Sequence, residues 1–491
     1  MLDELLSGYA EVKENVQVSG LSLDSRKIKA GGAFVALSGT IQHGIAFAGQ
    51  AAKNGAVAIL YEPVGEFKKI VAELEDMVYV AVENLSQNIG DIAARFFGFP
   101  AKQLVVIGIT GTNGKTTCSQ LLGQLLPDCG IIGTLGWGDA GHLNATENTT
   151  PDAISIQQIL DKFVSQRKIS VAMEVSSHGL EQGRVNGVVF AGAVFTNISR
   201  DHLDYHSSME AYIQAKLDLL AIPGLAFAVV NMDDQYVDNI ISAVPTTVRK
   251  FGFTRQENCA EGMEVLSASN IEYTLGGIKC DLHWQGDQAS LATPLVGEFN
   301  LENSLAVICV LIAMDKNLSE AAAMMAKALP VNGRMERVSN SESSLQVFVD
   351  YAHTPDALER ALKSLRLHSQ NELLLVFGCG GDRDQGKRSQ MGYIATQWAD
   401  KFVLTDDNPR YENAQQIIDD ILAGCLGQKV TVIKDREAAI REVIKTASNQ
   451  DLVLIAGKGH EDYQEQEGKR RHFSDREVAI DALKVRGDSP C

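Results

Sequence analysis

The chain has 491 residues, which at roughly 150 residues per domain predicts about three domains. Apolar residues make up 45% of it and charged residues 22%, a balance that excludes a largely disordered or fibrous protein. Its 44 basic and 62 acidic side chains give a net charge of −18, which disfavours nucleic acid as the main partner. No apolar run approaches the roughly 18 residues of a membrane span, and the first residues lack the basic start of a signal peptide. We therefore expect a cytoplasmic protein.

The eight cysteines are scattered along the chain without CxxC pairs. Cys118, Cys309 and Cys425 lie in apolar surroundings, where a thiol behaves as a small apolar side chain. We interpret the cysteines as core residues rather than as disulfide partners or zinc ligands.

The first hundred residues hold short strand-like runs at 33–37 and 56–60. They end at 96–100, where glycine and proline indicate a domain boundary. The next run, 104–109, is rich in β-branched residues and too short for a typical helix, so it is predicted to be a buried parallel strand. Further runs of this kind lie at 171–175, 191–198 and 226–230. They are separated by stretches long enough for crossover helices, which indicates an α/β domain.

A second boundary is predicted at 329–333, after an alanine-rich helical stretch. Strand-like runs then return at 346–350, 373–377, 402–405 and 452–456. Polar or glycine-rich clusters follow these runs at 350–353, 380–383, 406–410 and 457–461. Open α/β sheets bind ligands beyond the carboxyl ends of their strands, so the four clusters are predicted to meet in one crevice.

The segment 110–117, Thr-Gly-Thr-Asn-Gly-Lys-Thr-Thr, lies between the strand expected at 104–109 and an apolar-periodic helical stretch. That context is typical of a phosphate-binding loop, although an ordinary turn is the alternative. Backbone N–H groups of such a loop close on phosphate oxygens, Lys115 adds a positive charge, and the Thr116 hydroxyl can reach Mg²⁺. The longer form of this motif would place glycine at position 109, where this chain has Ile109.

Two buried ionisable residues and one histidine are candidate metal ligands. Glu174 lies in the strand expected at 171–175, where a carboxylate needs either an ion-pair partner or a metal ion. Lys216 lies on the apolar face of a helix expected over 209–220, so it should lose its proton or find a partner, unless it snorkels at the edge of that face. A neutral lysine can take up CO₂ and become an anionic carbamate ligand, which the spacing alone does not establish. His202 is either a further ligand or a structural histidine.

Five segments together resemble the Mur ligases, ATP-dependent amide-forming enzymes of bacterial peptidoglycan precursor synthesis. These segments are 111–117, 174–178 (Glu-Val-Ser-Ser-His), 201–206 (Asp-His-Leu-Asp-Tyr-His), 333–336 (Gly-Arg-Met-Glu) and 350–355 (Asp-Tyr-Ala-His-Thr-Pro). The resemblance covers nearly the whole chain. In this family the short phosphate loop is the normal form, so Ile109 is no departure from it.

The resemblance implies an α/β fold of three domains. Residues 1–100 would bind the UDP end of the substrate, 101–330 would form a central ATP-binding domain with a parallel sheet of the P-loop ATPase type, and 331–491 would form a doubly wound, Rossmann-like domain for the incoming amino acid. ATP and Mg²⁺ are the implied cofactors, with CO₂ for carbamylation of Lys216. The segment 407–410, Asp-Asn-Pro-Arg, resembles the motif of members that add meso-diaminopimelate to UDP-N-acetylmuramoyl-L-alanyl-D-glutamate through an acyl phosphate. We expect these small-molecule partners, no nucleic acid, no membrane span and a monomer.

The resemblance also assigns roles to individual residues. Catalytic roles are implied for Lys115, Glu174, His202 and Lys216, and Mg²⁺ would be held by Thr116, Glu174, His202 and carbamylated Lys216. ATP contacts are implied for Gly111, Thr112, Asn113, Gly114, Lys115, Thr116, Thr117, Asn303, Arg334 and Asp350. Contacts with the UDP substrate are implied for Leu23, Ser25, Thr40, Ile41, Gln42, Asn148, Thr149, Thr150, Ser176, Gln182 and Arg184. Contacts with diaminopimelate are implied for Arg383, Asp407, Asn408, Pro409, Arg410, Gly457 and Glu461.

The charges of the acceptor give these last residues distinct expected roles. Compared with lysine, meso-diaminopimelate has a second carboxylate, which Arg410 and Arg383 can bind as planar forks. Asn408 is expected to add a hydrogen bond, Glu461 to meet the ammonium, and Asp407 mainly to fix the loop. A relative that uses lysine, or that adds glutamate to folate, is one alternative. A regulatory protein that binds nucleotide without ligation is another, although nucleotide binding alone needs no carbamate.

Overall fold

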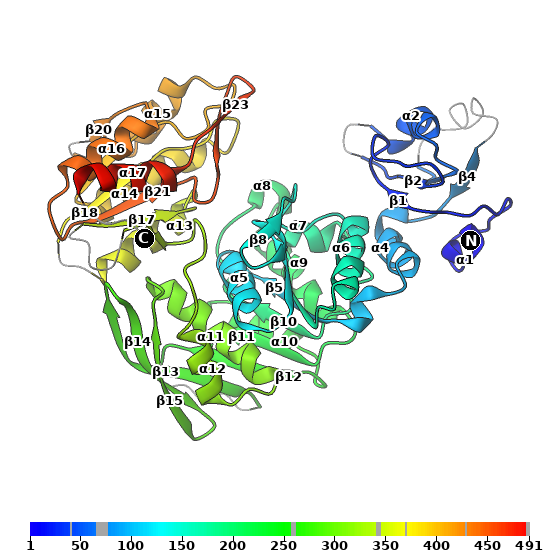
Figure 1. The fold of residues 1–491 in the computed structure, drawn as a ribbon, viewed down its shortest axis with the longest axis horizontal. Coiled ribbons are helices and arrows are strands. Elements are labelled where there is room, and N and C mark those ends of the chain that lie inside the picture. Colours follow the sequence, from blue (N-terminus) through cyan, green and yellow to red (C-terminus); the bar gives the residue numbers. More distant parts are fainter. Residues whose placement is uncertain are drawn as a thin grey trace.

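The computed structural model describes residues 1–39, 42–64, 77–256, 262–339, 345–368, 371–427 and 430–487. Figure 1 shows three successive parts of the chain, coloured blue, cyan to green, and yellow to red. Each part has its own sheet, because the strands of each sheet come from one continuous stretch of the sequence. The α/β class expected from the sequence is confirmed.

The N-terminal part is a small parallel sheet with the strand order β1-β2-β3-β4. Its strand β2 is buried throughout, and apolar side chains of β2, β3 and α4 form one core with α1. The elements are α1 (Leu2–Leu6), β1 (Leu21–Ser22), β2 (Ala33–Ala36), η1 (Gly44–Phe47), α2 (Ala48–Lys53), β3 (Ala58–Tyr61), β4 (Val78–Ala81), α4 (Leu85–Phe96) and η2 (Pro100–Gln103).

The central part is a sheet with the order β15-β14-β13-β12-β11-β10-β5-β9-β6-β7-β8. The strands from β12 to β6 in that order are parallel, and β5 pairs with β10 and β9 in the middle of them. Helices α5, α11 and α12 pack on one face of this sheet, and α6, α9 and α10 pack on the other.

Four central strands were predicted, as the runs 104–109, 171–175, 191–198 and 226–230. The bounds of β5, β9 and β11 agree with the first, second and fourth of these runs to within one residue, whereas β10 is shorter than the third. The strands are β5 (Val105–Thr110), β6 (Cys129–Gly133), β7 (Gly136–Asp139), β8 (His142–Asn144), β9 (Ser170–Glu174), β10 (Gly192–Phe195), β11 (Phe227–Asn231), β12 (Arg249–Thr254), β13 (Glu264–Thr274), β14 (Gly277–Trp284) and β15 (Asp287–Thr293). The helices are α5 (Lys115–Leu125), α6 (Ala153–Ser165), α7 (Ser177–Glu181), α8 (Leu203–His206), α9 (Met209–Ala221), α10 (Val237–Ala243), α11 (Glu298–Ala313) and α12 (Leu318–Met325).

The C-terminal part is a sheet with the order β16-β17-β21-β18-β19-β20, parallel except for β16. Helices α13, α14 and α15 cover one face, and α16 and α17 cover the other, so the predicted doubly wound arrangement is confirmed. The strands are β16 (Glu336–Arg337), β17 (Gln346–Asp350), β18 (Leu373–Phe377), β19 (Lys401–Leu404), β20 (Val430–Val432), β21 (Leu452–Ala456), β22 (Tyr463–Gln466) and β23 (Lys469–His472). The helices are α13 (Pro355–Arg366), α14 (Gly386–Trp398), α15 (Ala414–Leu422), α16 (Arg436–Thr446) and α17 (Asp475–Arg486).

Two further expectations concern the whole chain. In the ranges described, no helix is long and apolar enough to cross a membrane. The six cysteines in those ranges are free thiols, and all but Cys425 are buried, as expected for core residues.

A buried ion pair ties the two helices of one C-terminal face to the sheet. Arg436 at the start of α16 donates to both carboxylate oxygens of Asp475 at the start of α17, at 2.7 and 2.8 Å. It also donates to the carbonyl oxygen of Ala456, the last residue of β21, at 2.8 Å. Neither charged side chain is exposed to solvent. Removing one partner would therefore leave a buried charge without compensation.

We expect Asp475→Ala to lower the free energy of unfolding by about 3–5 kcal/mol, because the Arg436 guanidinium would stay buried and unpaired. Chemical denaturation at neutral pH measures this loss. Arg441→Ala is the matched control, since it removes the exposed pair between Arg441 and Glu437 on α16 and should cost less than about 1 kcal/mol. Equal losses in the two variants would contradict the prediction.

Candidate active site

The phosphate-loop segment connects β5 to α5, as the sequence predicts. Its two glycines have positive φ angles, 145° at Gly111 and 86° at Gly114. A Cβ atom at Gly111 would lie 1.9 Å from the Thr196 hydroxyl, and one at Gly114 would lie 2.4 Å from the Asn303 side-chain oxygen. Glycine is therefore required at both positions, and the loop leads directly into the N-terminus of α5.

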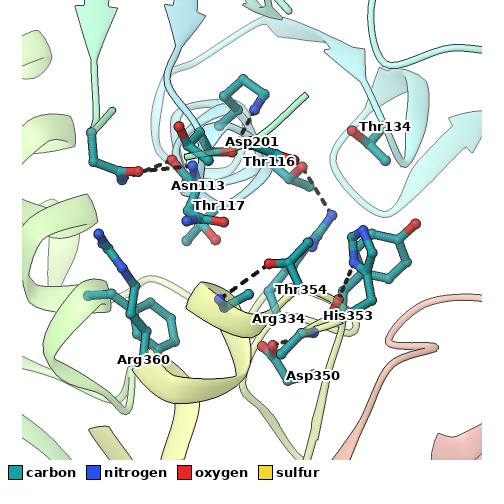
Figure 2. A pocket seen from close by; sticks show the side chains of 18 of the residues that line it. Asn113, Thr116, Thr117, Thr134, Asp201, Arg334, Asp350, His353, Thr354 and Arg360 are labelled. Carbon is teal, nitrogen blue, oxygen red and sulfur yellow. Dashed lines mark hydrogen bonds between the residues drawn. The ribbon is translucent and has the colours of Figure 1, made fainter. Parts of the chain in front are cut away.

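A cavity of about 330 Å³ lies at this helix N-terminus, between the central and C-terminal parts (Figure 2). All the residues expected to contact ATP line it except Gly111. Figure 2 shows Arg334 of the C-terminal part pointing toward Thr116, to whose hydroxyl it donates a hydrogen bond of 3.3 Å. Burial raises the pKa of Asp350 at the C-terminal wall, where its carboxylate accepts hydrogen bonds from two backbone N–H groups.

Glu174 is fully buried at the end of β9, and its partners are hydroxyl and amide groups. The hydroxyls of Thr116 and Thr134 donate to its Oε2 at 2.9 and 3.0 Å, and the Thr134 backbone N–H donates to Oε1 at 3.0 Å. No ion pair reaches Glu174 from any residue that the structure describes, so the ion-pair alternative is wrong there. The carboxylate and the two hydroxyls form a set of hard oxygen atoms beside the phosphate loop, the ligand chemistry that Mg²⁺ prefers.

Lys216 is 1% exposed and lies directly behind the phosphate loop, so the prediction of an inward-facing side chain is confirmed and the snorkelling alternative is wrong. Its ammonium donates to the Gly111 carbonyl oxygen at 3.0 Å, and Lys115 donates to the same oxygen at 2.7 Å. Burial, together with the neighbouring positive charge of Lys115, holds the pKa of Lys216 well below its usual range. Lys216 is therefore the buried amine of the site that most readily becomes neutral.

His202 lies at the mouth of the cavity with a half-exposed side chain and a backbone φ of 52°. Its Nε2 is 3.5 Å from a carboxylate oxygen of Asp201, and its ring centroid is 6.3 Å from that of Tyr212. Lys216 in turn lies 4.5 Å from the Tyr212 ring centroid. Glu174 and His202 thus line one cavity, whereas Lys216 does not line it. Across the described ranges, no group of three or more His, Cys, Asp or Glu side chains is arranged to hold a metal ion.

The residues of α7 and its surroundings that were expected for the UDP substrate form one hydrogen-bonded group. The Thr150 hydroxyl donates to the Glu174 carbonyl oxygen and lies 3.0 Å from the Ser176 hydroxyl. Arg184 donates to the Thr150 carbonyl oxygen at 2.8 Å and to the Gln182 side-chain oxygen at 2.6 Å. These side chains are therefore linked to the backbone of Glu174, whose carboxylate borders the phosphate loop.

The other residues expected for this substrate are spread between the N-terminal and central parts. They are Leu23 and Ser25 after β1, exposed Gln42, exposed Asn148, and Thr149 at the cavity wall, while Thr40 and Ile41 lie outside the described residues. An ion pair of 3.6 Å joins Lys27 to Glu147. The loop after β1 and the segment that precedes Asn148 therefore lie side by side.

A second cavity lies beyond the carboxyl ends of the C-terminal strands. It is lined by Arg383, Asp407, Asn408, Arg410, Gly457 and Glu461, whereas Pro409 is buried and does not line it. The four polar clusters predicted to meet in one crevice all contribute to its wall. The two cavities share the wall residues Asp201, His202, Tyr351, His353 and Thr354.

Arg410 is held in a left-handed backbone conformation, with a φ of 50°. Its N–H donates to the Glu465 carbonyl oxygen, and its own carbonyl oxygen accepts from the Glu467 N–H, so the β22–β23 hairpin fixes its backbone. Its side chain donates to the Gly381 carbonyl oxygen at 2.7 Å. This hydrogen bond holds one guanidinium nitrogen in place, and Arg410 lines the cavity.

The Asn408 side chain is hydrogen-bonded to other residues at the cavity wall. Its amide donates to Glu461 at 2.8 Å, and its side-chain oxygen accepts from Lys458 and from the Glu465 N–H. The Asn408 side chain therefore connects Glu461, Lys458 and Glu465 to one another at the cavity wall. The sequence analysis did not select Lys458, although it lies in the cluster at 457–461. A lysine between two glycines directly after a buried strand could have identified it as a candidate site residue.

Asp356, at the start of α13, was also missed. Its carboxylate accepts hydrogen bonds of 3.0 Å from the Asn113 amide of the phosphate loop and from the Ser199 hydroxyl. A loop of the central part and a helix of the C-terminal part are thus joined between the two cavities, since Asn113 lines the first and Asp356 lines the second. Since a single carboxylate makes both contacts, the position of α13 is coupled to that of the phosphate loop.

Comparison with known proteins identifies the family. The family models named Mur ligase family catalytic domain, Mur ligase middle domain, and Mur ligase glutamate ligase domain match residues 17–97, 109–311 and 333–459. The chain belongs to the Mur ligase family. A relative named UDP-N-acetylmuramoyl-L-alanyl-D-glutamate--2,6-diaminopimelate ligase from Xylella fastidiosa is 44% identical over 98% of this chain and 97% of its own length. A relative of the same name from Pseudomonas syringae is 41% identical over 98% of both chains.

Solved structures of this family have the same fold. A structure of UDP-N-acetylmuramoyl-L-alanyl-D-glutamate--2,6-diaminopimelate ligase superposes with a TM-score of 0.69 at 36% identity and covers 96% of both chains. A MurF ligase from Thermotoga maritima in complex with ADP superposes with a TM-score of 0.65 over 96% of this chain and 99% of its own. At 17% identity, the likeness to this MurF ligase shows the fold alone.

Two histidines of this Mur ligase are held neutral: His353, where the cavities meet, and His460, whose ring centroid lies 5.1 Å from that of Tyr351 in the shared wall. Burial lowers the pKa of His353 to about 4, with Lys387 adding a smaller repulsion. Burial also lowers the pKa of His460 to about 4, with a contribution from Arg334. The His353 ring donates from Nδ1 to the Tyr351 carbonyl oxygen at 2.8 Å, a contact that raises its pKa and offsets only part of the effect of burial.

We expect the free energy of unfolding to fall as the pH drops from about 6.5 toward 4. In that window the two histidines take up protons in the unfolded chain but stay neutral in the folded one, so protons favour unfolding. His353→Gln should reduce this fall, whereas His142→Gln, at an exposed position, should leave it unchanged. Urea denaturation at several pH values measures the slopes, and identical slopes in wild type and His353→Gln would contradict the prediction.

Proposed function

We propose that this chain is the ligase that joins meso-diaminopimelate to UDP-N-acetylmuramoyl-L-alanyl-D-glutamate and converts ATP to ADP and phosphate. The observation that carries the proposal is the shared wall between a phosphate-loop cavity and a second cavity lined by Arg383, Arg410 and Glu461. A ligase needs this arrangement, because an intermediate activated in one cavity must meet an amine held in the other. The names of the full-length relatives support the same activity.

We assign residues 1–100 to the UDP end of the substrate, 101–330 to ATP and 331–491 to the amino acid. The hydrogen-bonded group of Thr150, Ser176, Gln182 and Arg184 would then carry the peptide end of the UDP substrate toward the phosphate loop. The ion pair between Lys27 and Glu147 supports a substrate that spans the N-terminal and central parts.

In the first step, a carboxylate oxygen of the glutamyl residue attacks the γ-phosphorus of ATP, and the bond to the leaving ADP oxygen breaks. Carboxylate and phosphate repel each other, so the site must supply positive charge where the two groups approach. Lys115, Arg334 and the N-terminus of α5 all lie at that wall. In the second step, the free amine attacks the acyl carbon, phosphate leaves with the electron pair of its C–O bond, and the amine loses a proton.

Mg²⁺ fits the residues present, because Glu174 and the Thr116 hydroxyl offer hard oxygen atoms at the phosphate loop. We assign its ligands to Thr116, Glu174, His202 and carbamylated Lys216. When bound, Mg²⁺ supplies positive charge that offsets the repulsion between carboxylate and phosphate. Thr134 positions Glu174 through two hydrogen bonds.

The convergence of two lysines on one carbonyl oxygen supports a carbamate at Lys216. Lys115 and Lys216 would repel each other if both were charged, so Lys216 is the better candidate for a neutral amine. A neutral amine can attack CO₂: the N–C bond forms, one N–H proton leaves, and an anionic carbamate results. This anion would attract Lys115, which turns the repulsion between the two residues into attraction.

We expect Lys216→Ala to lower kcat by about 10³-fold or more, because an anionic ligand is lost. Added acetate or formate should restore part of the activity by occupying the vacated space, whereas Glu174→Ala should show no such rescue. Nuclear magnetic resonance with isotopically labelled CO₂ offers a second readout, a carbamate signal present in wild type and absent in Lys216→Ala. Near-normal turnover of Lys216→Ala would contradict the assignment.

The acceptor pocket suits a zwitterionic head group. Arg410 and Arg383 line it with positive charge, and Glu461 lines it with negative charge. The distal end of meso-diaminopimelate has one carboxylate and one ammonium, whereas lysine has the ammonium alone. Lysine would therefore leave the arginines without an anion, which a site built around such groups rejects strongly.

We expect kcat/KM for meso-diaminopimelate to exceed that for L-lysine by roughly 10⁴-fold, and Arg410→Ala to reduce this preference to about tenfold or less. The measurement is phosphate release with the UDP-dipeptide, ATP and each amino acid in turn. Arg470→Ala is the matched control, because Arg470 lies on the exposed strand β23 of the hairpin that holds Arg410. Comparable values for the two amino acids in wild type would overturn the acceptor assignment while leaving ligation intact.

A further inference from the structure

Lys458 lies beneath the acceptor pocket and is completely buried. Its ammonium donates to three side chains: Asp407 at 3.2 Å, Asn408 at 3.0 Å and Glu461 at 3.2 Å. A lysine ammonium has three N–H donors, so this set of acceptors uses all of them. Lys458 therefore has no donor left for a substrate, and it does not line the pocket.

The partners of Lys458 come from two loops that are distant in the sequence. Asp407 and Asn408 follow β19, whereas Glu461 and Lys458 follow β21. Asn408 completes the link by donating to the same Glu461 oxygen, Oε2, at 2.8 Å. The Oε2 atom of Glu461 is thus fixed by two donors, and the orientation of the whole carboxylate follows.

This arrangement leaves defined atoms available to a ligand. Within the described ranges, no hydrogen bond is made by Oε1 of Glu461 or by Oδ2 of Asp407, and both residues line the pocket. Arg410 is anchored through one nitrogen to the Gly381 carbonyl oxygen. The pocket therefore presents oriented carboxylate oxygens on one side and a guanidinium on the other.

The charges of this cluster do not cancel. Asp407 and Glu461 contribute two negative charges, and Lys458 contributes one positive charge. The nearby Arg436 is neutralised by its buried pair with Asp475. One negative charge remains, which matches the single ammonium at the distal end of the acceptor. Without Lys458, two negative charges would face that ammonium, and the carboxylate of the head group would be repelled more strongly.

We propose that Lys458 is a positioning residue that sets the selectivity of the acceptor pocket, by orienting Glu461 and Asn408 and by leaving the cluster that it forms with Asp407 and Glu461 one net negative charge. The proposal deepens the proposed function and rests on it. Lys458 acts through its neighbours rather than by touching the acceptor. Its loss should therefore change the recognition of the amino acid and leave the use of ATP unchanged.

The test compares Lys458→Met with wild type in steady-state kinetics. We expect KM for meso-diaminopimelate to rise about 30-fold or more, because a buried, hydrogen-bonded charge pair loses one partner. KM for ATP and for the UDP-dipeptide should stay within about twofold, and the preference for meso-diaminopimelate over L-lysine should fall at least about tenfold. Lys401→Met is the control, because it removes an ion-paired lysine of the same part, exposed and outside the pocket.

A double variant separates orientation and charge from folding. Lys458→Met with Asp407→Asn removes one positive and one negative charge, so the net charge of the cluster stays the same while the bonds to Glu461 and Asn408 are lost. We expect its acceptor KM to lie between those of wild type and Lys458→Met. If Lys458→Met does not fold, a raised acceptor KM in the double variant alone supports the proposal.

Two results would overturn the proposal. A lowered melting temperature with unchanged acceptor KM and selectivity, in either variant, would overturn the proposal and leave Lys458 as a structural residue. A uniform fall in kcat with all three KM values unchanged would overturn it as well. Failure of the proposed function is distinguishable, because wild type itself would then release no phosphate in response to meso-diaminopimelate.

Discussion

Two lysine side chains meet at one backbone oxygen, and the chemistry of the site depends on that contact. Lys115 and Lys216 donate to the Gly111 carbonyl oxygen from opposite elements, the first turn of α5 and the buried face of α9. Two positive charges this close, in a buried position, require either neutralisation of one of them or anions nearby. Glu174 lies beside the same loop and is held there by the hydroxyl groups of Thr116 and Thr134 rather than by an ion pair.

The arrangement of the cavities follows from the parallel sheets. Both ligand cavities lie at carboxyl ends of strands, one above β5 and β9 and the other above β18, β19 and β21, because helices cover the faces of each sheet. Two cross-contacts then bring the ends of the sheets together, Asp356 with Asn113 and Arg334 with Thr116. Both contacts involve residues of the phosphate loop or of the adjoining turn of α5. The phosphate loop and the start of α5 are therefore tied directly to the C-terminal part that supplies the rest of the cavity wall.

The strands and the phosphate loop could be predicted from the sequence because their signals are local. A buried parallel strand is a short apolar run, and β17, β18 and β21 begin and end where such runs do. The inward position of Lys216 was also predictable, since helical periodicity alone places it on the buried face of α9. Contacts between distant segments were not predictable. Asn408 and Lys458 lie in two loops about fifty residues apart in the sequence. The residue pattern of neither loop shows that the two loops meet in the fold. Glu174 shows the same limit, because its hydroxyl partner Thr134 follows a different strand.

Buried lysines therefore appear twice at this site, with opposite electrostatic surroundings. Lys216 is buried beside another cation and has a carbonyl oxygen as its hydrogen-bond acceptor, which favours the neutral amine. Lys458 is equally buried, but two carboxylates and an amide oxygen lie 3.0 to 3.2 Å from its Nζ. Burial is therefore the same in both cases, and the neighbouring charges differ. Lys216 lies beside the cationic Lys115, whereas Lys458 lies between the carboxylates of Asp407 and Glu461. Burial alone does not distinguish the two lysines, whereas the charges around them do.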